Sequence, residues 1–343
     1  MKSLSILRVI FIAFAGLAIA TSCTKVGPQG PAGENGTNGT DGTNGVDGNV
    51  TCLVCHSGNN MEEKKAEFAM SEHSVAAVAL SEGGRASCAR CHCSQGFVEY
   101  ATLGTVVGDI ANPQPWECST CHGLHQTFEA QDYALRLSDP VVSVADGTTT
   151  LDLNGNSNLC ANCHQARTAP PNIASPGDTY KITNTHYGPH HGPQANVVYG
   201  IGFAEIPGSV AYPAAGSSKH LAQASCTGCH MADFTNGEGG HSLIPSLAAC
   251  NACHGANETD YNHGGVQTIV QQELDQLRDK LVSLGVVEQL DDGTYEVVTG
   301  TYPMVQAEAY FNWAGLSDDR SLGVHNPPYV KALLLNSIEA LNN

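Results

Sequence analysis

The chain has 343 residues, including 14 cysteines, 15 Lys or Arg and 33 Asp or Glu, so its formal net charge is −18. This acidity excludes a conventional nucleic-acid binder, because neutralising phosphates needs clustered Lys and Arg. Aromatic residues make up only 6% of the chain and 37 residues are glycine. A core built from side chains alone would be thin, so we expect something other than amino acids to fill the interior.

Residues 1–22 have the pattern of an export signal rather than of a folded element. Lys2 and Arg8 precede an apolar run that ends at Ala20, and this run is too short for a comfortable membrane span. Ordinary secretion with cleavage near Ala20 is one interpretation. The sequence before Cys23 resembles a loose lipobox, so we expect cleavage there and lipidation of Cys23. The chain would then be an exported outer-membrane lipoprotein, at the cell surface or extracellular.

Residues 23–50 would form the lipid anchor and a collagen-like spacer. Glycine recurs at every third position from Gly27 to Gly48, which is the G-X-Y pattern. Prolines occur only at the start of the run, so a triple helix would be weak. We therefore interpret the segment as a solvated spacer between anchor and domain, with a trimeric stalk as the alternative.

Six Cys-x-x-Cys pairs, each followed directly by histidine, account for twelve of the fourteen cysteines. The six motifs, numbered one to six in chain order, are Cys52–Cys55–His56, Cys88–Cys91–His92, Cys118–Cys121–His122, Cys160–Cys163–His164, Cys226–Cys229–His230 and Cys250–Cys253–His254. This is the attachment site of c-type haem. Two thiols add to the two vinyl groups of the porphyrin, and the following imidazole lies under the iron.

A zinc site, a thioredoxin-like redox pair and a disulfide framework are the competing interpretations of such pairs. The constant gap and the constant histidine favour haem, so the sequence predicts six covalently attached haem c groups with the six motif histidines as iron ligands. Cys93 is left over; it is either a free thiol against a haem or the site of an intermolecular disulfide.

Nine histidines lie outside the motifs, enough to give every iron a second imidazole. The predicted ligands among them are His73, His125, His190, His191, His220, His241 and His325. Of the adjacent His190 and His191, we expect one to bind iron and the other to form a hydrogen bond or to lie near a propionate. His186 and His263 are expected at the surface or behind a ligand. A helix-like stretch over residues 62–80 would present His73.

The motif spacing leaves no room for a separate domain around each haem. We therefore predict a hexahaem core over residues 51–260, made of irregular chain and short α-helices wrapped around closely packed haems, with little β-structure. A short hairpin arm is expected at residues 148–153. Residues 261–343 would form a helical segment that returns to the core.

Two helices are predicted in that C-terminal segment. An apolar stripe runs through Val270, Leu274, Leu277 and Leu281 with Gly285 as a stop, which is helical spacing. The final helix would begin at Pro327 with Asn326 as its cap.

Four segments, at residues 71–73, 187–194, 226–231 and 323–329, resemble multihaem c-type cytochromes of metal-reducing and related bacteria. That group includes outer-membrane and extracellular cytochromes, some of which polymerise into conductive filaments. The likeness covers roughly residues 51–343. It implies bis-histidine haems stacked closely in a chain, although the lipobox departs from filament-forming members, which are released rather than anchored.

These features favour an electron conduit for extracellular electron transfer rather than an enzyme, because an iron held by two imidazoles has no position for a substrate. Expected partners are other redox proteins or cytochromes, another copy of the chain as a polymer, extracellular acceptors such as metal oxides, and a membrane through the acyl anchor; no nucleic acid is expected. The alternatives are a filament (nanowire) subunit and a multihaem reductase of nitrite or hydroxylamine, which would need an open iron.

Overall fold

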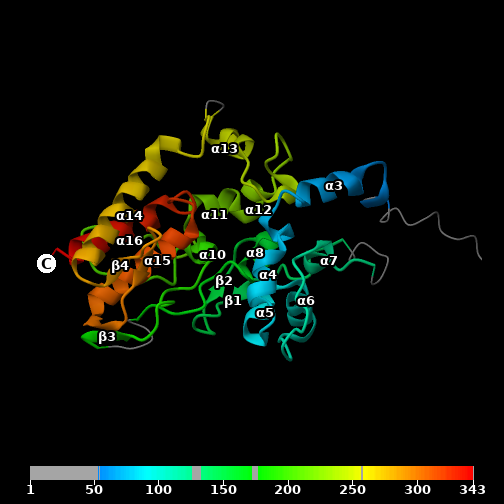
Figure 1. Cartoon of the computed structure of the whole chain (residues 1–343). Helices are drawn as coiled ribbons and strands as arrows, with labels where there is room; N and C mark the ends of the chain where they lie inside the picture. Colours follow the sequence, from blue (N-terminus) through cyan, green and yellow to red (C-terminus); the bar gives the residue numbers. More distant parts are fainter. Residues whose placement is uncertain (1–52, 54, 126–132, 172–176, 256–257, 343) are drawn as a thin grey trace, which may run out of the picture. The chain divides into compact units, whose positions relative to one another are not determined.

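A computed structural model describes residue 53 and residues 55–125, 133–171, 177–255 and 258–342, which belong to one compact unit (Figure 1). The predicted signal segment, the spacer, Cys23 and Cys52 lie outside the described residues. Within the described residues, no helix is both long enough and apolar enough to cross a membrane.

Helices dominate the described residues. The α-helices are α3 (Asn60–Phe68), α4 (Ala76–Glu82), α5 (Ala86–His92), α6 (Ser94–Leu103), α7 (Cys118–Cys121), α8 (Asn158–Ala161), α10 (Gln194–Tyr199), α11 (Lys219–Gln223), α12 (Ser225–His230), α13 (Leu247–His254), α14 (Val266–Ser283), α15 (Met304–Asp319) and α16 (Pro327–Ala340). Short 3₁₀ turns are η1 (Glu72–Ser74), η3 (Gly155–Ser157), η4 (Gly240–Ser242) and η5 (His263–Gly265).

The β-structure consists of three small antiparallel pairs. β1 (Val141–Val142) pairs with β2 (Thr150–Leu151), which forms the hairpin expected near residues 148–153. β3 (Thr179–Ile182) pairs with β6 (Gly300–Pro303), and β4 (Val287–Gln289) pairs with β5 (Tyr295–Val297). The prediction of short helices with little β-structure is therefore confirmed.

Motifs two to six each lie on or at the end of a short helix: α5, α7, α8, α12 and α13. The helix explains the motif's spacing, because residues three and four positions apart lie on the same helix face. Both thiols and the histidine of a motif are thereby presented on one side of the chain.

The prediction of a helical stretch over residues 62–80 was wrong in one respect. α3 ends at Phe68, and His73 lies on the 3₁₀ turn η1 before α4 begins. Ser71 causes the break, because its hydroxyl accepts a hydrogen bond from the His73 backbone N–H at 3.1 Å. Serine competes with helix continuation in this way and starts a new turn instead.

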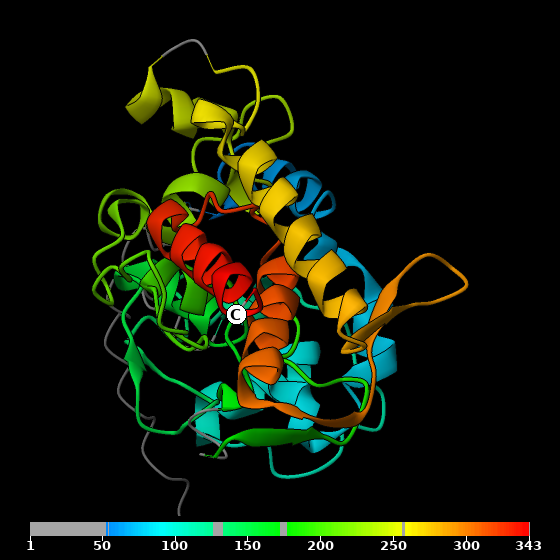
Figure 2. The same ribbon diagram turned by 90° about the vertical axis from the view of Figure 1, so that its left-hand side faces the viewer.

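The C-terminal segment supplies the largest apolar core. Val270, Leu274, Leu277 and Leu281 of α14 are all buried. The helix ends in a Schellman motif: Gly285, at φ +71°, donates to Val282, and the N–H of residue 286 donates to the Leu281 carbonyl. Figure 2 shows α14, α15 and α16 lying alongside one another in yellow, orange and red.

Helix α15 was not predicted, because it carries no apolar stripe. Its buried residues include Ala307, Tyr310, Phe311, Asn312 and Leu316, which point in several directions around the helix axis. A helix surrounded by other elements on most sides has no polar face to reveal its period.

Apolar packing is uneven along the chain. The core around α14–α16 is built from large side chains such as Leu277, Leu333 and Tyr329. The apolar cluster at α4–α6 contains only Ala79, Ala89 and Cys93 as fully buried members. This contrast agrees with the expectation that the motif-bearing part needs a non-protein component to fill it.

Asn312 fastens the loop before residue 205 to α15. Its side chain is fully buried and forms hydrogen bonds of 2.9 and 2.8 Å with the backbone N–H and carbonyl of Ala204. Asn312→Ala leaves the Ala204 N–H buried without a partner, whereas the Ala204 carbonyl keeps the backbone N–H of residue 206 at 2.9 Å. We therefore expect the free energy of unfolding to fall by about 1–3 kcal/mol. Chemical denaturation followed by circular dichroism measures this. Gln276→Ala, on the exposed face of α14, is the control, and equal midpoints for the two variants would contradict the prediction.

Candidate haem cavity and histidine pairs

One cavity of about 1320 Å³ joins the first four motifs. The Cys and His side chains that line it are Cys55, His56, His73, Cys88, Cys91, His92, Cys118, Cys121, His122, His125, Cys160, Cys163, His164, His190, His191 and His241. The cavity lies where apolar packing is thin, so its shape suits a large group held by several chain segments at once.

Each of the six motif histidines has a histidine from outside the motifs with its ring centre about 6 Å away. The six pairs and their ring-centre distances are His56–His125 at 6.0 Å, His92–His190 at 6.1 Å, His122–His241 at 6.3 Å, His164–His73 at 5.9 Å, His230–His325 at 6.4 Å and His254–His220 at 5.9 Å. The first four pairs line the shared cavity, and the last two lie outside it.

This separation fits one metal ion between two imidazoles. An imidazole nitrogen bonds a metal at about 2.0–2.1 Å and lies about 1.1 Å from its ring centre, so two opposed ligands have ring centres about 6.3 Å apart. The observed range of 5.9–6.4 Å brackets that value. The donors therefore suit a porphyrin iron with two axial imidazoles.

The remaining histidines have other surroundings. His186 is exposed. His191 has a side chain that is 78% exposed and lies 3.1 Å from Asp318. His263 is exposed, bonds to Glu258 at 2.7 Å and stacks on His254 at 4.0 Å, which is too close for a metal between the rings. Of the adjacent His190 and His191, the structure therefore brings only His190 to a motif histidine.

Hydrogen bonds at Nδ1 orient several of the paired rings. His122 bonds to the carbonyl of Tyr133 at 2.6 Å, and His230 bonds to that of Leu243 at 2.8 Å. A carbonyl can only accept, so Nδ1 carries the proton and Nε2 keeps its lone pair for a metal.

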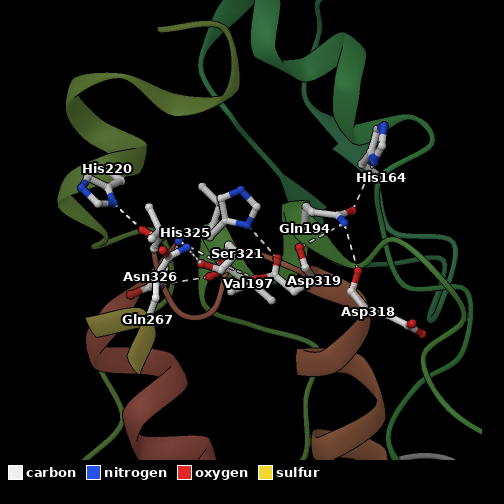
Figure 3. Close-up of polar contacts among 12 residues, drawn as sticks. His164, Gln194, Val197, His220, Gln267, Asp318, Asp319, Ser321, His325 and Asn326 are labelled. Atoms are coloured by element: carbon white, nitrogen blue, oxygen red, sulfur yellow. Dashed lines mark hydrogen bonds and ion pairs between the residues drawn. The ribbon is translucent and has the colours of Figure 1, made fainter. Parts of the chain in front are cut away.

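Two more rings are held in the same way. The Nδ1 of His220 lies 2.5 Å from the carbonyl of residue 324. Figure 3 shows His164 directed at the amide oxygen of Gln194, and the distance between the two atoms is 3.1 Å. These acceptors are backbone groups or amides from distant segments, and no sequence motif marks them.

Burial favours the neutral form of several of these imidazoles, and that is the form that metal ligation requires. Desolvation lowers the pKa of His73 to about 4, and the nearby His164 lowers it further. Desolvation also lowers the pKa of His190 to about 4, with Arg167 contributing. The pKa values of His92, His164 and His230 are lowered for the same first reason.

His325 differs from the other buried rings. Burial by itself lowers its pKa, but the charge of Asp319 and the hydrogen bond to it outweigh burial and raise the pKa. Figure 3 shows the His325 ring turned toward Asp319, and the Nδ1–Oδ1 distance is 2.6 Å. The sequence analysis named His325 but not Asp319. The signal for Asp319 was that its carboxylate lies only six residues before His325.

Cationic side chains line the same cavity. The guanidinium of Arg90 lies 3.8 Å above the Tyr100 ring and contacts the Asn162 side chain at 3.4 Å. Its buried Nε has no hydrogen-bond partner among the described residues. A porphyrin carries two propionate carboxylates, and a guanidinium with an unused donor is well suited to one.

Neighbouring motifs touch one another. The Cys91 and Cys163 thiols are in contact, and each lies within 3.7–3.8 Å of a backbone carbonyl beside the other. The thiols of Cys160 and Cys226 are also in contact. Motif four therefore adjoins both motif two and motif five.

Further contacts extend this arrangement. The N–H of Ser246, which caps α13, donates to the carbonyl of Cys229 at 2.9 Å, so motif six adjoins motif five. Trp116, two residues before motif three, packs edge-on against His73 at 5.3 Å. Since His73 is the partner of motif four, motif three also adjoins motif four.

The described cysteines form no disulfides with one another. Cys93, for which a thiol against a haem or an intermolecular disulfide was considered, is fully buried beside Ala79 and Ala89. Its sulfur accepts the Gly96 N–H at 3.4 Å and caps α6. Burial raises the pKa of this thiol, which disfavours the reactive thiolate form.

Comparisons with protein families and with curated proteins find no match. Among solved structures, the chain is similar to the crystal structure of outer cell wall cytochrome OcwA, with a TM-score of 0.53 and 18% identity over 81% of this chain and 50% of that chain. The chain thus spans about half the length of that protein. At this identity the likeness shows a shared fold, and the expectation of a cytochrome fold is confirmed at that level.

Proposed function

We propose that the protein is a hexahaem c-type cytochrome that conducts electrons at or outside the outer membrane. The observation that carries the proposal is the set of six histidine pairs, each with a spacing suited to one iron. Haem c supplies a one-electron couple when bound. The cysteines of the motifs would attach it, and the paired histidines would ligate its iron.

The pairing argues for conduction and against catalysis at iron. A reductase of nitrite or hydroxylamine needs one axial position free for its substrate, whereas every motif histidine here faces a second imidazole. A group with both positions filled exchanges electrons only. The protein is therefore proposed to act as an electron-transfer protein and not as an enzyme.

The motif contacts support a continuous path. Motif six adjoins five, five adjoins four, and four adjoins both two and three. His125, the partner of His56 in motif one, lies three residues after motif three in the sequence. Motif one therefore lies next to motif three. Electrons would pass between motif six and motif one through motif four.

The acidic chain is proposed to dock on basic redox proteins or other cytochromes and to meet extracellular acceptors such as metal oxides, with Cys23 anchoring it in the outer membrane. All six partner histidines come from the same chain. A monomer therefore needs no histidine from a second copy, which favours a conduit over a filament subunit.

An intact mass of the mature protein is expected to show six haems and an acyl chain together. Its ferric spectrum should be low-spin, and the reduced protein should bind no carbon monoxide, because both axial positions are filled. Markedly fewer haems, or carbon monoxide binding at most of them, would contradict the proposal.

Adjacent histidines provide a matched test of the axial assignment. His190→Ala is expected to give one high-spin haem of six that binds carbon monoxide after reduction, because His190 faces His92. His191→Ala is expected to leave all six low-spin, since its ring is exposed and lies beside Asp318. Optical and electron paramagnetic resonance spectra of the two variants measure this. An open haem in the His191 variant alone would reverse the assignment.

A further inference from the structure

A buried carboxylate lies behind one of the six histidine pairs. Asp319, the last residue of α15, is 3% exposed. Its Oδ1 lies 2.6 Å from the Nδ1 of His325, and its Oδ2 accepts the hydroxyl of Ser321 (Figure 3). Within the part of the chain that is described, no Lys or Arg forms an ion pair with it.

The position makes this negative charge unusually uncompensated. The C-terminal end of a helix carries a partial negative charge, so the helix itself disfavours an anion there. A buried carboxylate requires hydrogen-bonded partners, and here the imidazole of His325 is the main one. The ring therefore lies directly against the carboxylate, whose charge it shares with the Ser321 hydroxyl.

The groups that contact the other paired rings carry less uncompensated negative charge. Four of them bond to carbonyl or amide oxygens, as described above. His241 has a carboxylate nearby, since Glu67 lies 3.5 Å from its Nδ1. Lys64, at 2.7 Å, balances that carboxylate, which also accepts the backbone N–H of His241 at 2.9 Å.

We infer that Asp319 is a positioning residue that acts through His325 to lower the reduction potential of the haem held between His230 and His325. This inference rests on the proposed function and deepens it. A carboxylate that accepts the Nδ1 proton pushes electron density into the ring and makes it a stronger donor. A stronger donor favours the ferric state, and burial preserves the effect by limiting screening.

The charge balance of the couple points the same way. Reduction adds one electron to this centre, and the proton stays between Nδ1 and Oδ1, so the added charge is placed near an anion that pairs with no Lys or Arg of the described residues. Motif five lies between motifs six and four, so the lowered potential lies inside the proposed path and not at its end. Electrons passing from motif six to the motifs around the cavity would therefore have to cross a haem of lower reduction potential.

Two neighbouring carboxylates give a matched pair of variants, each tested in the full holoprotein after its six haems have been counted by mass. Asp319→Asn retains an oxygen acceptor and removes the charge beside His325. Asp318→Asn removes the same charge one residue away, where the carboxylate meets exposed His191. In a spectroelectrochemical titration, Asp319→Asn is expected to move one of six one-electron waves to more positive potential, while Asp318→Asn moves none by as much.

A second readout separates tuning from simple loss of structure. In the ferric electron paramagnetic resonance spectrum, one low-spin species of six should change its g values in the Asp319 variant while remaining low-spin. If no wave moves further in Asp319→Asn than in Asp318→Asn, the inference fails. The proposed function fails separately, if the unaltered protein lacks six low-spin haems.

Ser321→Ala covers the case in which Asp319→Asn does not mature with six haems. It keeps the bond between Asp319 and His325 and removes the hydroxyl that donates to the carboxylate and accepts the His325 backbone N–H at 3.3 Å. The carboxylate then acts more strongly on the ring, so the same wave is expected to move to more negative potential. An unchanged wave in that variant would overturn the inference.

Discussion

The separation of about 6 Å between paired imidazoles is the constraint on which the rest of this structure depends. Most pairs join segments far apart in the chain: His92 meets His190, and His122 meets His241. To hold two rings opposed at that distance, the intervening chain must be led over the cavity in a fixed course. Short helices, turns and ordered loops serve this need better than long regular elements, which explains the local character of the fold.

Two regions of the chain differ in how their interiors are filled. Around α14, α15 and α16 the apolar side chains of the protein pack on one another and exclude water. Around α4–α6 the apolar cluster has only three buried members, all small, although Phe97 of α6 is also buried. The walls of a large cavity lie beside this cluster. His325 links the two regions, since it lies between α15 and α16 and faces motif five.

The sequence was informative where covalent chemistry fixes the spacing of residues. The spacing within the six motifs is the one that thioether attachment of haem requires. The nine histidines outside the motifs predicted a second set of imidazoles. Which histidine faces which motif was not predictable, because the pairing of His73 with His164 depends on the tertiary course of the chain. The turn at Ser71 and the buried helix α15 were missed for local reasons, a competing side-chain hydrogen bond and the absence of an apolar stripe. The acceptors behind the rings are mostly backbone carbonyls, which carry no residue-type signal.

The uneven apolar core has a consequence for biogenesis. A chain is synthesised and exported from its N-terminus, and its parts fold in that order where they are able to. Here the described part that is synthesised first, up to the end of α6, has the smallest apolar cluster, and most members of the largest cluster are synthesised last. The early segments must therefore remain open long enough for the maturation machinery to reach each cysteine pair. The C-terminal helices, which are made last, would then pack against a region in which the proposed haems are already attached.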